Sequence, residues 1–254
     1  DLHRVDRRQR QNVYKRQDII GVEQNNIYCR LKKLLYKFKD KLMHIPNGLD
    51  FDKDIFKDKV NFEDKENIVL SVGRIGSPEK RTENIMEAFK SLEESQRENW
   101  KLVLVGPIVS GFEEYIKVFF EKYPEMRKFI IFKGAIYDRN KLFSEYKKAR
   151  IFCLTSEYES FGFVLIESAA FGDVIISTRV GIADEIIKDE SGIIVPFNDK
   201  EALSMALLNL IKCPDMKKMS EYSEKLCREN FDWNKIVKGL YEKIEELRGR
   251  SKNA

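Results

Sequence analysis

The chain has 254 residues, which is enough for one large domain or two small ones. It contains no apolar run near the roughly 20 residues that a membrane-spanning helix needs. The net charge of +4 is confined to residues 1–17, which hold six basic and two acidic side chains, while the rest of the chain carries 40 of each. Because no basic stripe follows that segment, a nucleic-acid partner is excluded.

Residues 1–17 are not expected to belong to the fold. Residues 12–17 (NVYKRQ) resemble the translation of a sequencing adapter. We therefore predict that residues 1–17 are a non-native leader left by sequence assembly, with a native basic leader as the alternative. Long reads across this locus distinguish the two, because native sequence running through Gln17 would contradict an assembly scar.

The cysteine and histidine content argues against metal chemistry and histidine-dependent catalysis. His3 and His44 are the only histidines, so neither a metal cluster nor a catalytic triad is expected within this chain. No Cys-x-x-Cys pair occurs, which indicates reduced thiols, an intracellular protein and no zinc site. The four cysteines are Cys29, Cys153, Cys213 and Cys227.

The first predicted elements precede a polar stretch at residues 52–65. Apolar residues at helical spacing predict a helix over 25–38. Residues 41–45 predict a short strand, which the Pro-Asn-Gly turn at 46–48 closes.

A regular alternation of strands and helices follows and defines the fold class. It predicts an α/β doubly wound parallel sheet, in which ligands bind outside the carboxyl ends of the strands. Thr82 is the expected N-cap of the first helix, and Tyr146 is expected to face inward from the third. The predicted strands are 68–72, 100–105, 129–132, 151–154, 174–177 and 192–195, and the helices are 82–92, 112–120, 140–149, 182–187 and 200–211.

Two helices are predicted at the carboxyl end, of which the last begins at Trp233. One stripe of this helix is apolar. From this pattern alone, the stripe is expected to pack on its own domain. The stripe consists of Trp233, Ile236, Val237, Leu240, Tyr241, Ile244 and Leu247.

Residues 159–172 carry the strongest functional signal. Glu159 and Glu167 stand eight positions apart, and Glu167 lies on a predicted helix that is otherwise apolar. A buried carboxylate costs several kcal/mol unless it is paired. The first-turn N–H groups near 161–164 would form an anion site between the two glutamates. The alternative is structural: a glutamate favoured by the helix dipole and another that is salt-bridged to the next helix.

Several further motifs occur in a recognisable order. They are IPNGLD at 45–50, VGR at 72–74 followed by Lys80, LVG at 104–106, FKG at 132–134 and TRVG at 178–181. Together with Glu159 and Glu167 they resemble the retaining glycosyltransferases of family 4 (glycosyltransferases group 1), which have the GT-B fold. The resemblance covers residues 41–245 and implies a Rossmann-like C-terminal half of that fold, with the N-terminal half mostly missing.

The resemblance implies a donor site for a nucleoside-diphosphate sugar. Gly73, Arg74 and Lys80 correspond to the motif that binds the donor phosphates. Glu159, the implied catalytic residue, would accept hydrogen bonds from the sugar hydroxyls, and Glu167 would hold the ribose. A strand-end surface arginine remains the alternative for Arg74, and Arg81 is a second candidate beside Lys80.

The resemblance also assigns backbone contacts within the same site. Groups near Ser160, Phe161, Gly162 and Phe163 would line the sugar and the phosphates, and the glycine would allow close approach. The base would lie against the loop formed by Gly134, Ala135 and Ile136. No metal is expected, because no Asp-x-Asp motif is present and Arg74 and Lys80 can supply the positive charge.

Domain limits follow from the same resemblance. Residues 18–50 would be the last helix and strand of a truncated N-terminal acceptor domain together with the interdomain turn. Residues 51–230 would be the nucleotide-sugar-binding domain, and residues 231–254 a crossover helix and tail.

The expected activity is transfer of a hexose or N-acetylhexosamine from a nucleoside-diphosphate sugar to a glycan or lipid-linked acceptor, with retention of configuration. The resemblance suggests surface polysaccharide or lipopolysaccharide synthesis, in the cytoplasm or at the inner face of the membrane through peripheral association of the full-length enzyme. Since the acceptor domain is mostly missing, we expect this chain to bind donor without transferring sugar.

Two other enzyme classes do not fit the sequence. A dinucleotide-binding domain needs Gly-x-Gly-x-x-Gly after its first strand, but residues 73–78 are GRIGSP. A P-loop needs Gly-x-x-x-x-Gly-Lys-Ser/Thr, which does not occur. A non-catalytic nucleotide-binding or scaffold domain remains the alternative, and replacement of Glu167 by Gln separates it from a donor site.

Overall fold

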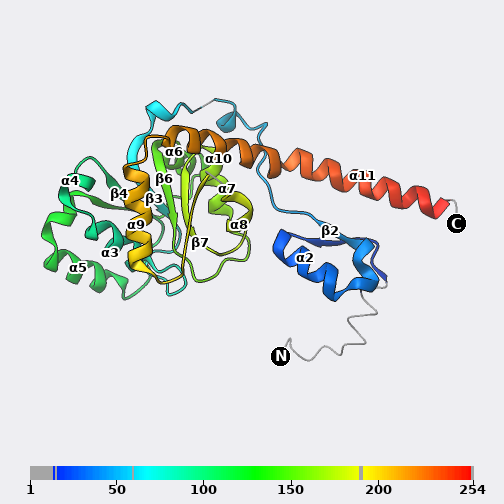
Figure 1. The fold of residues 1–254 in the computed structure, drawn as a ribbon, viewed down its shortest axis with the longest axis horizontal. Helices are drawn as coiled ribbons and strands as arrows, with labels where there is room; N and C mark the ends of the chain where they lie inside the picture. Colours follow the sequence, from blue (N-terminus) through cyan, green and yellow to red (C-terminus); the bar gives the residue numbers. More distant parts are fainter. Residues whose placement is uncertain (1–13, 15, 59, 189–190, 253–254) are drawn as a thin grey trace. The chain divides into compact units, whose positions relative to one another are not determined.

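The computed structural model describes residues 14, 16–58, 60–188 and 191–252. Most of the predicted leader, residues 1–13 and 15, lies outside the described residues. The chain divides into two compact units, Asp1–Asp50 with Phe231–Ala254, and Phe51–Asn230. Figure 1 shows the sheet and helices of the second unit, to which the predicted donor motifs from Gly73 to Glu167 belong.

A six-stranded parallel sheet forms the centre of the Phe51–Asn230 unit. The strand order is β5-β4-β3-β6-β7-β8, so the chain runs outward in one direction from β3 and in the other from β6. That reversal makes the junction between β3 and β6 the topological switch point, where ligands bind in open α/β sheets. The strands are β3 (Glu66–Val72), β4 (Lys101–Val105), β5 (Ile130–Gly134), β6 (Ala149–Leu154), β7 (Val174–Thr178) and β8 (Gly192–Val195).

All six predicted strands and the parallel, doubly wound arrangement are confirmed. The central strands are apolar runs because helices cover both faces of a parallel sheet. Right-handed crossovers that run in opposite directions from the switch point place α3 on one face and α7 on the other. The helices of this unit are α3 (Thr82–Ser91), α4 (Glu94–Arg97), α5 (Phe112–Lys122), α6 (Arg139–Lys148), α7 (Phe163–Ala170), α8 (Ala183–Ile186), α9 (Lys200–Ile211) and α10 (Met216–Asn230).

The starts of two helices differ from the prediction. Arg81, in the left-handed conformation with φ 50°, occupies the N-cap position of α3. Thr82 is the first helical residue, and its hydroxyl instead accepts a hydrogen bond from the backbone N–H of Gly76 at 2.9 Å. Helix α7 begins at Phe163 because Gly162 adopts φ 91° as its N-cap. The first helical N–H groups therefore belong to Phe163 and Val164, so the first turn expected near 161–164 begins two residues later.

The other unit contains a small parallel sheet. Strand β1 (Ile20–Val22), which the sequence did not predict, pairs with β2 (Leu42–His44). The predicted helix over 25–38 ends early: α2 covers Asn25–Leu34, and a 3-10 helix, η2, covers Tyr36–Lys41. The last helix, α11, covers Trp233–Lys252. Within the described part of the chain, no helix combines the length and apolar character needed to cross a membrane.

Candidate donor-binding site

The loops that follow β3 and β6 are joined at the switch point by hydrogen bonds. The hydroxyl of Thr155 donates to the backbone carbonyls of Lys80 at 2.8 Å and Arg81 at 3.1 Å. The backbone N–H of Glu157 donates to the carbonyl of Glu79 at 2.7 Å. These contacts connect residues about 75 positions apart in sequence, and they fix the two predicted donor motifs against each other.

Lys80 and Glu159 form an ion pair between these two loops. The Nζ of Lys80 donates to Oε1 of Glu159, and the hydroxyl of Ser156 donates to the same oxygen at 2.7 Å. The side chains are 19% and 15% exposed, so solvent screens the pair only partly. Gly73 lies beneath Lys80, because a Cβ added there would be 3.5 Å from the lysine Cε. The structure therefore brings three predicted site residues together.

The neighbouring cations point elsewhere. Arg74 is 65% exposed and forms an ion pair with Glu79, a geometry that matches the alternative of a strand-end surface arginine. Arg81 lies over the ring of Phe197, with 5.6 Å between the guanidinium carbon and the ring centroid. Of the adjacent candidates Lys80 and Arg81, it is Lys80 that contacts Glu159.

Glu167 lies on α7, and both of its carboxylate oxygens have partners. Oε1 accepts a hydrogen bond from Nη2 of Arg139 at 2.7 Å, and Oε2 accepts one from the hydroxyl of Tyr146 at 3.0 Å. The Glu167 side chain is only 3% exposed. Burial, together with the negative charge of Glu167, raises the pKa of Tyr146 well above its usual range. The phenol therefore remains protonated and acts as a donor.

The sequence did not predict either partner of Glu167. It predicted that Tyr146 faces inward from a helix, which the structure confirms, but gave no sign that its hydroxyl reaches Glu167. Arg139 begins α6 after Asp138, whose side chain accepts hydrogen bonds from the N–H groups of Asn140 and Lys141. That capping position was a possible signal for an ordered helix start, but not for the pairing with Glu167.

Glycines lie at the carboxyl ends of three neighbouring strands, beside the Lys80–Glu159 ion pair. Gly73 follows β3, Gly106 follows β4, and Gly134 ends β5 with φ 69°. A Cβ at Gly106 would overlap the carbonyl oxygen of Gly73, and the N–H of Gly106 donates to the carbonyl of Gly134 at 2.8 Å. Ala135 and Ile136, which are predicted to lie beside the base, follow Gly134 in the chain and are half-buried.

The loop that carries Glu159 is also supported from the next strand. The N–H of Ile182 donates to the carbonyl of Phe161 at 3.0 Å, and a Cβ at Gly181 would overlap that same oxygen. The side chain of Phe161 is buried in the core, whereas that of Phe163 is exposed. Residues 160–163 can therefore offer mainly backbone groups to a ligand, together with the ring of Phe163.

A second buried ion pair lies beneath α6. Nζ of Lys65 is 2.7 Å from Oδ1 of Asp173, and it also donates to the carbonyls of Tyr146 and Ala149 at 3.2 Å and 2.6 Å. Burial raises the pKa of Asp173 to about 7, although the charge of Lys65 opposes this shift. The pair anchors the end of α6, and thus Tyr146, to the sheet.

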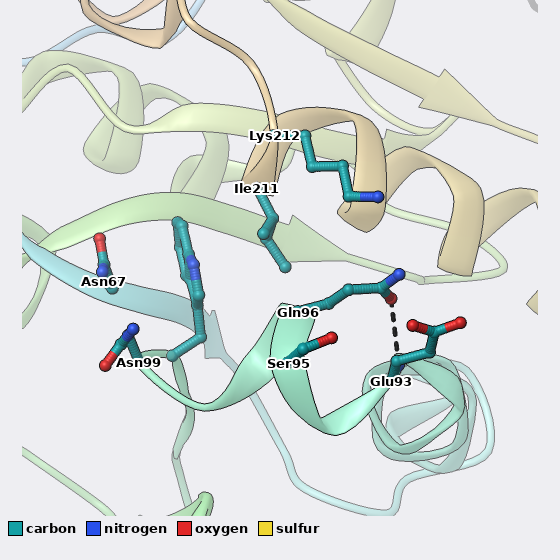
Figure 2. A pocket seen from close by; sticks show the side chains of 8 residues that line it. Asn67, Glu93, Ser95, Gln96, Asn99, Ile211 and Lys212 are labelled. Atoms are coloured by element: carbon teal, nitrogen blue, oxygen red, sulfur yellow. Dashed lines mark hydrogen bonds between the residues drawn. The ribbon is translucent and has the colours of Figure 1, made fainter.

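A separate pocket lies at the amino ends of the strands, opposite the Lys80–Glu159 ion pair. It has a volume of about 410 Å³ and lies where β3 and β4 begin, near Asn67 and Trp100. Figure 2 shows a hydrogen bond beside this pocket, in which the backbone N–H of Glu93 donates to the side-chain oxygen of Gln96. The two residues form the capping box of α4. These two residues thus serve local structure. Among the residues that the structure describes, no group of three or more His, Cys, Asp or Glu side chains could hold a metal ion.

Solved structures of similar fold match this arrangement. The GtfA/B complex superimposes with a TM-score of 0.76 at 18% identity, over 96% of this chain and 48% of that chain. Anabaena HepE in complex with UDP gives a TM-score of 0.72 at 16% identity, over 90% and 64%. The six-stranded sheet and its switch point are those of the C-terminal half of a GT-B glycosyltransferase.

Residues 52–226 match the family model described as glycosyl transferases group 1. The chain therefore belongs to that family, which confirms the resemblance predicted from the motifs. An uncharacterised glycosyltransferase of Methanocaldococcus jannaschii is 27% identical over 227 residues, or 84% of this chain and 56% of the relative. An α-1,4-N-acetyl-D-galactosaminyltransferase of Campylobacter jejuni is 27% identical over 76% and 53%. The chain thus spans about half the length of these relatives.

Proposed function

We propose that residues 51–230 bind a nucleoside-diphosphate sugar and that the whole protein transfers its hexose or N-acetylhexosamine to a glycan or lipid-linked acceptor. The observation that carries this proposal is the Lys80–Glu159 ion pair at the switch point of the sheet. It lies beside the glycines at the carboxyl ends of β3, β4 and β5, where a ligand can approach the backbone closely.

The ion pair supplies the two groups that a donor requires. The diphosphate attracts the ammonium of Lys80, and the sugar hydroxyls replace that ammonium as hydrogen-bond donors to Glu159. The first N–H groups of α7, at Phe163 and Val164, add a partial positive charge toward the leaving group. Glu167 would then accept hydrogen bonds from the ribose hydroxyls.

The family's retaining chemistry fits such a site. The acceptor hydroxyl attacks the anomeric carbon from the side on which the diphosphate leaves. The bond from that carbon to the diphosphate oxygen breaks, the bond to the acceptor oxygen forms, and the hydroxyl proton passes to the diphosphate. The protein's tasks are to position the reactants and to stabilise the charge on the leaving group, and Lys80 is placed to do the latter without a metal.

The name of the Campylobacter relative and the ligand of the Anabaena structure favour particular substrates. A UDP-sugar is the first donor to test, and a lipid-linked glycan in surface polysaccharide synthesis is the first acceptor. The proposed location is the cytoplasm, at the inner face of the membrane. Because the relatives are about twice as long, we propose that acceptor binding needs further sequence and that this chain alone binds donor only.

Calorimetric titration tests donor binding directly. The chain would be titrated with UDP, GDP and ADP in the presence of EDTA, as the unmodified protein and as Lys80→Gln. We expect one diphosphate to bind and Lys80→Gln to weaken it by about tenfold, since a hydrogen bond to a charged group contributes about 1.5–3 kcal/mol. The matched control is Lys117→Gln, which removes an exposed lysine paired with Glu114 on α5.

Two results would contradict the proposal. Failure of every diphosphate to bind the unmodified chain would favour the scaffold alternative. Equal weakening by Lys80→Gln and Lys117→Gln would show attraction by net charge and not a site at Lys80. A separate incubation with UDP-sugars and a panel of acceptors tests the donor-only proposal, which measurable turnover would overturn.

A further inference from the structure

Arg139 connects the predicted base loop to the carboxylate of Glu167. It is the first residue of α6 and follows the loop that begins at Gly134. Its side chain is 60% exposed, whereas that of Glu167 is 3% exposed. Arg139 therefore places a solvated cation against a carboxylate that is almost wholly buried.

The two oxygens of Glu167 have partners of different character. Oε2 accepts from Tyr146, a fully buried residue whose backbone carbonyl is in turn held by Lys65. Oε1 accepts from Arg139, which comes from the solvent side. A carboxylate oxygen has room for a second donor, so Oε1 is the oxygen that a ligand can reach while Tyr146 holds the other.

Two contacts fix the position of the guanidinium, and a third fixes the helix start that carries Arg139. Asp138 caps the start of α6 through the N–H of Asn140 at 2.9 Å. The guanidinium carbon of Arg139 lies 4.7 Å from the ring centroid of Phe143, a distance typical of a cation–π contact. With the 2.7 Å bond to Glu167, these contacts hold Arg139 in place before any ligand binds.

We propose that Arg139 is a positioning residue for nucleoside recognition: it holds Oε1 of Glu167 toward the ribose hydroxyls and remains bonded to it when the nucleotide binds. This inference rests on the proposed donor-binding function. Arg139 fixes one lone pair of the oxygen and leaves the other to a ribose hydroxyl. Without Arg139, Glu167 loses its orientation and the cation that offsets its charge in a buried site.

A comparison of UDP with inorganic pyrophosphate tests this role, because pyrophosphate has no ribose. Both would be titrated calorimetrically against the unmodified chain, Arg139→Gln, Arg139→Lys and Arg127→Gln. The last is a matched control, since Arg127 lies 4.7 Å from the ring centroid of Phe120 on α5 and therefore makes a cation–π contact of the same length. We expect Arg139→Gln to weaken UDP by roughly tenfold and to leave pyrophosphate within about twofold.

The variants Arg139→Lys and Arg127→Gln separate the role of the Arg139 side chain from a general effect of charge. Arg139→Lys keeps the charge but loses the planar fork, so it should restore part of the UDP affinity. Arg127→Gln should change neither ligand. Equal weakening of UDP and pyrophosphate would overturn the inference, because it would show an effect of net charge. Tighter UDP binding would overturn it as well, because Arg139 would then compete with the ribose.

The failure of this inference differs from the failure of the proposed function. If UDP binds the unmodified chain and depends on Lys80 but not on Arg139, only the role of Arg139 is wrong. A lower melting temperature of Arg139→Gln with an unchanged ratio of UDP to pyrophosphate affinity would likewise leave Arg139 a purely structural residue. If none of UDP, GDP and ADP binds the unmodified chain, the proposed function and this inference are both wrong.

Discussion

The ammonium of Lys65 and the carboxylate of Asp173 lie 2.7 Å apart, and their side chains are 1% and 0% exposed. The lysine precedes β3, and the aspartate stands between α7 and β7, so the pair joins segments that are 108 residues apart in sequence. Breaking a buried ion pair leaves a charge without its partner. The fold should therefore depend strongly on this contact.

Replacement of Lys65 by Met should lower the free energy of unfolding by about 3–5 kcal/mol, the range for loss of one partner from a buried pair. Urea unfolding followed by circular dichroism measures this change. The double variant Lys65→Met with Asp173→Val should be more stable than Lys65→Met alone, because no carboxyl group then remains buried without its partner. A double variant no more stable than the single one would show that the unpaired carboxylate is not the cause.

Asp173 should also give the protein a characteristic pH dependence. Burial raises its pKa in the folded protein to about 7, from an ordinary value of 3.8. Between these values the folded state binds more protons than the unfolded state. This contribution to stability is therefore present at about pH 4 and is lost as the pH rises to about 7. Its size should be on the order of a few kcal/mol, from 1.36 kcal/mol for each pKa unit.

The control for this pH dependence is Asp173→Asn. Unfolding free energies of both proteins would be measured from pH 4.5 to pH 8, and the difference between them isolates the aspartate. The difference should change across that range and level off above pH 7. Parallel curves for the two proteins would contradict a raised pKa of Asp173.

Glu167→Gln should weaken nucleotide binding as well as stability. The amide keeps the shape of the carboxylate, but it loses the ion pair with Arg139 and must turn an NH₂ group toward one of two donors, Arg139 or Tyr146. We expect UDP affinity to fall by about tenfold in calorimetry.

Glu145→Gln is the matched control for that substitution. Glu145 is also a largely buried glutamate, paired with Lys133 at 2.5 Å, but it touches neither Glu159 nor Glu167 in any contact that the structure describes. It should reduce stability without changing UDP affinity. Equal losses of affinity in both variants would indicate a general effect of destabilisation and would count against a ribose role for Glu167.

Gly181→Ala should disturb the loop that carries Glu159. Gly181 has φ 52°, and an added Cβ would overlap the carbonyl oxygen of Phe161. We expect a loss of stability of about 1–3 kcal/mol together with weaker UDP binding, because the loop of residues 159–162 must move. Thermal unfolding and calorimetry measure the two effects.

Gly111→Ala separates backbone strain from this displacement. Gly111 has φ 89°, but no atom lies within 4 Å of an added Cβ. Its substitution should cost only the strain of the left-handed conformation, about 1–2 kcal/mol, and should leave UDP affinity unchanged. Weaker UDP binding by Gly111→Ala would show that the support by Gly181 is not specific.

Local patterns were sufficient to predict the sheet. Each strand of the Phe51–Asn230 unit is a short apolar run between turn residues, and all six were predicted within a few residues of their observed bounds. Helix starts were less predictable, because they depend on backbone conformation. Gly162 delays α7 by adopting φ 91°, and Thr82 bonds to Gly76 and therefore does not cap α3.

The site was predictable only in part. The spacing of Glu159 and Glu167 marked both carboxylates as unusual, yet sequence spacing could not show that Lys80 contacts Glu159 and Arg74 does not. Lys80 and Glu159 meet because the order of the strands brings their loops together. Arg139 and Asp173 were missed for the same reason, since their partners are 28 and 108 positions away. Strand β1 is only three residues long, which is too short for a periodic signal.

At the carboxyl ends of β3, β4 and β5 the sheet presents mainly backbone atoms, because the residues there are Gly73, Gly106 and Gly134. Glycines follow β3 and β4 and end β5, and the carbonyl of Gly73 fills the space that a Cβ at Gly106 would need. In the proposed donor site, discrimination between nucleobases would be carried by amide and carbonyl groups, which every sequence shares. Donor preference in this protein should then change through insertion or deletion in the loop after β5, and point substitutions along that edge should affect folding before they affect specificity.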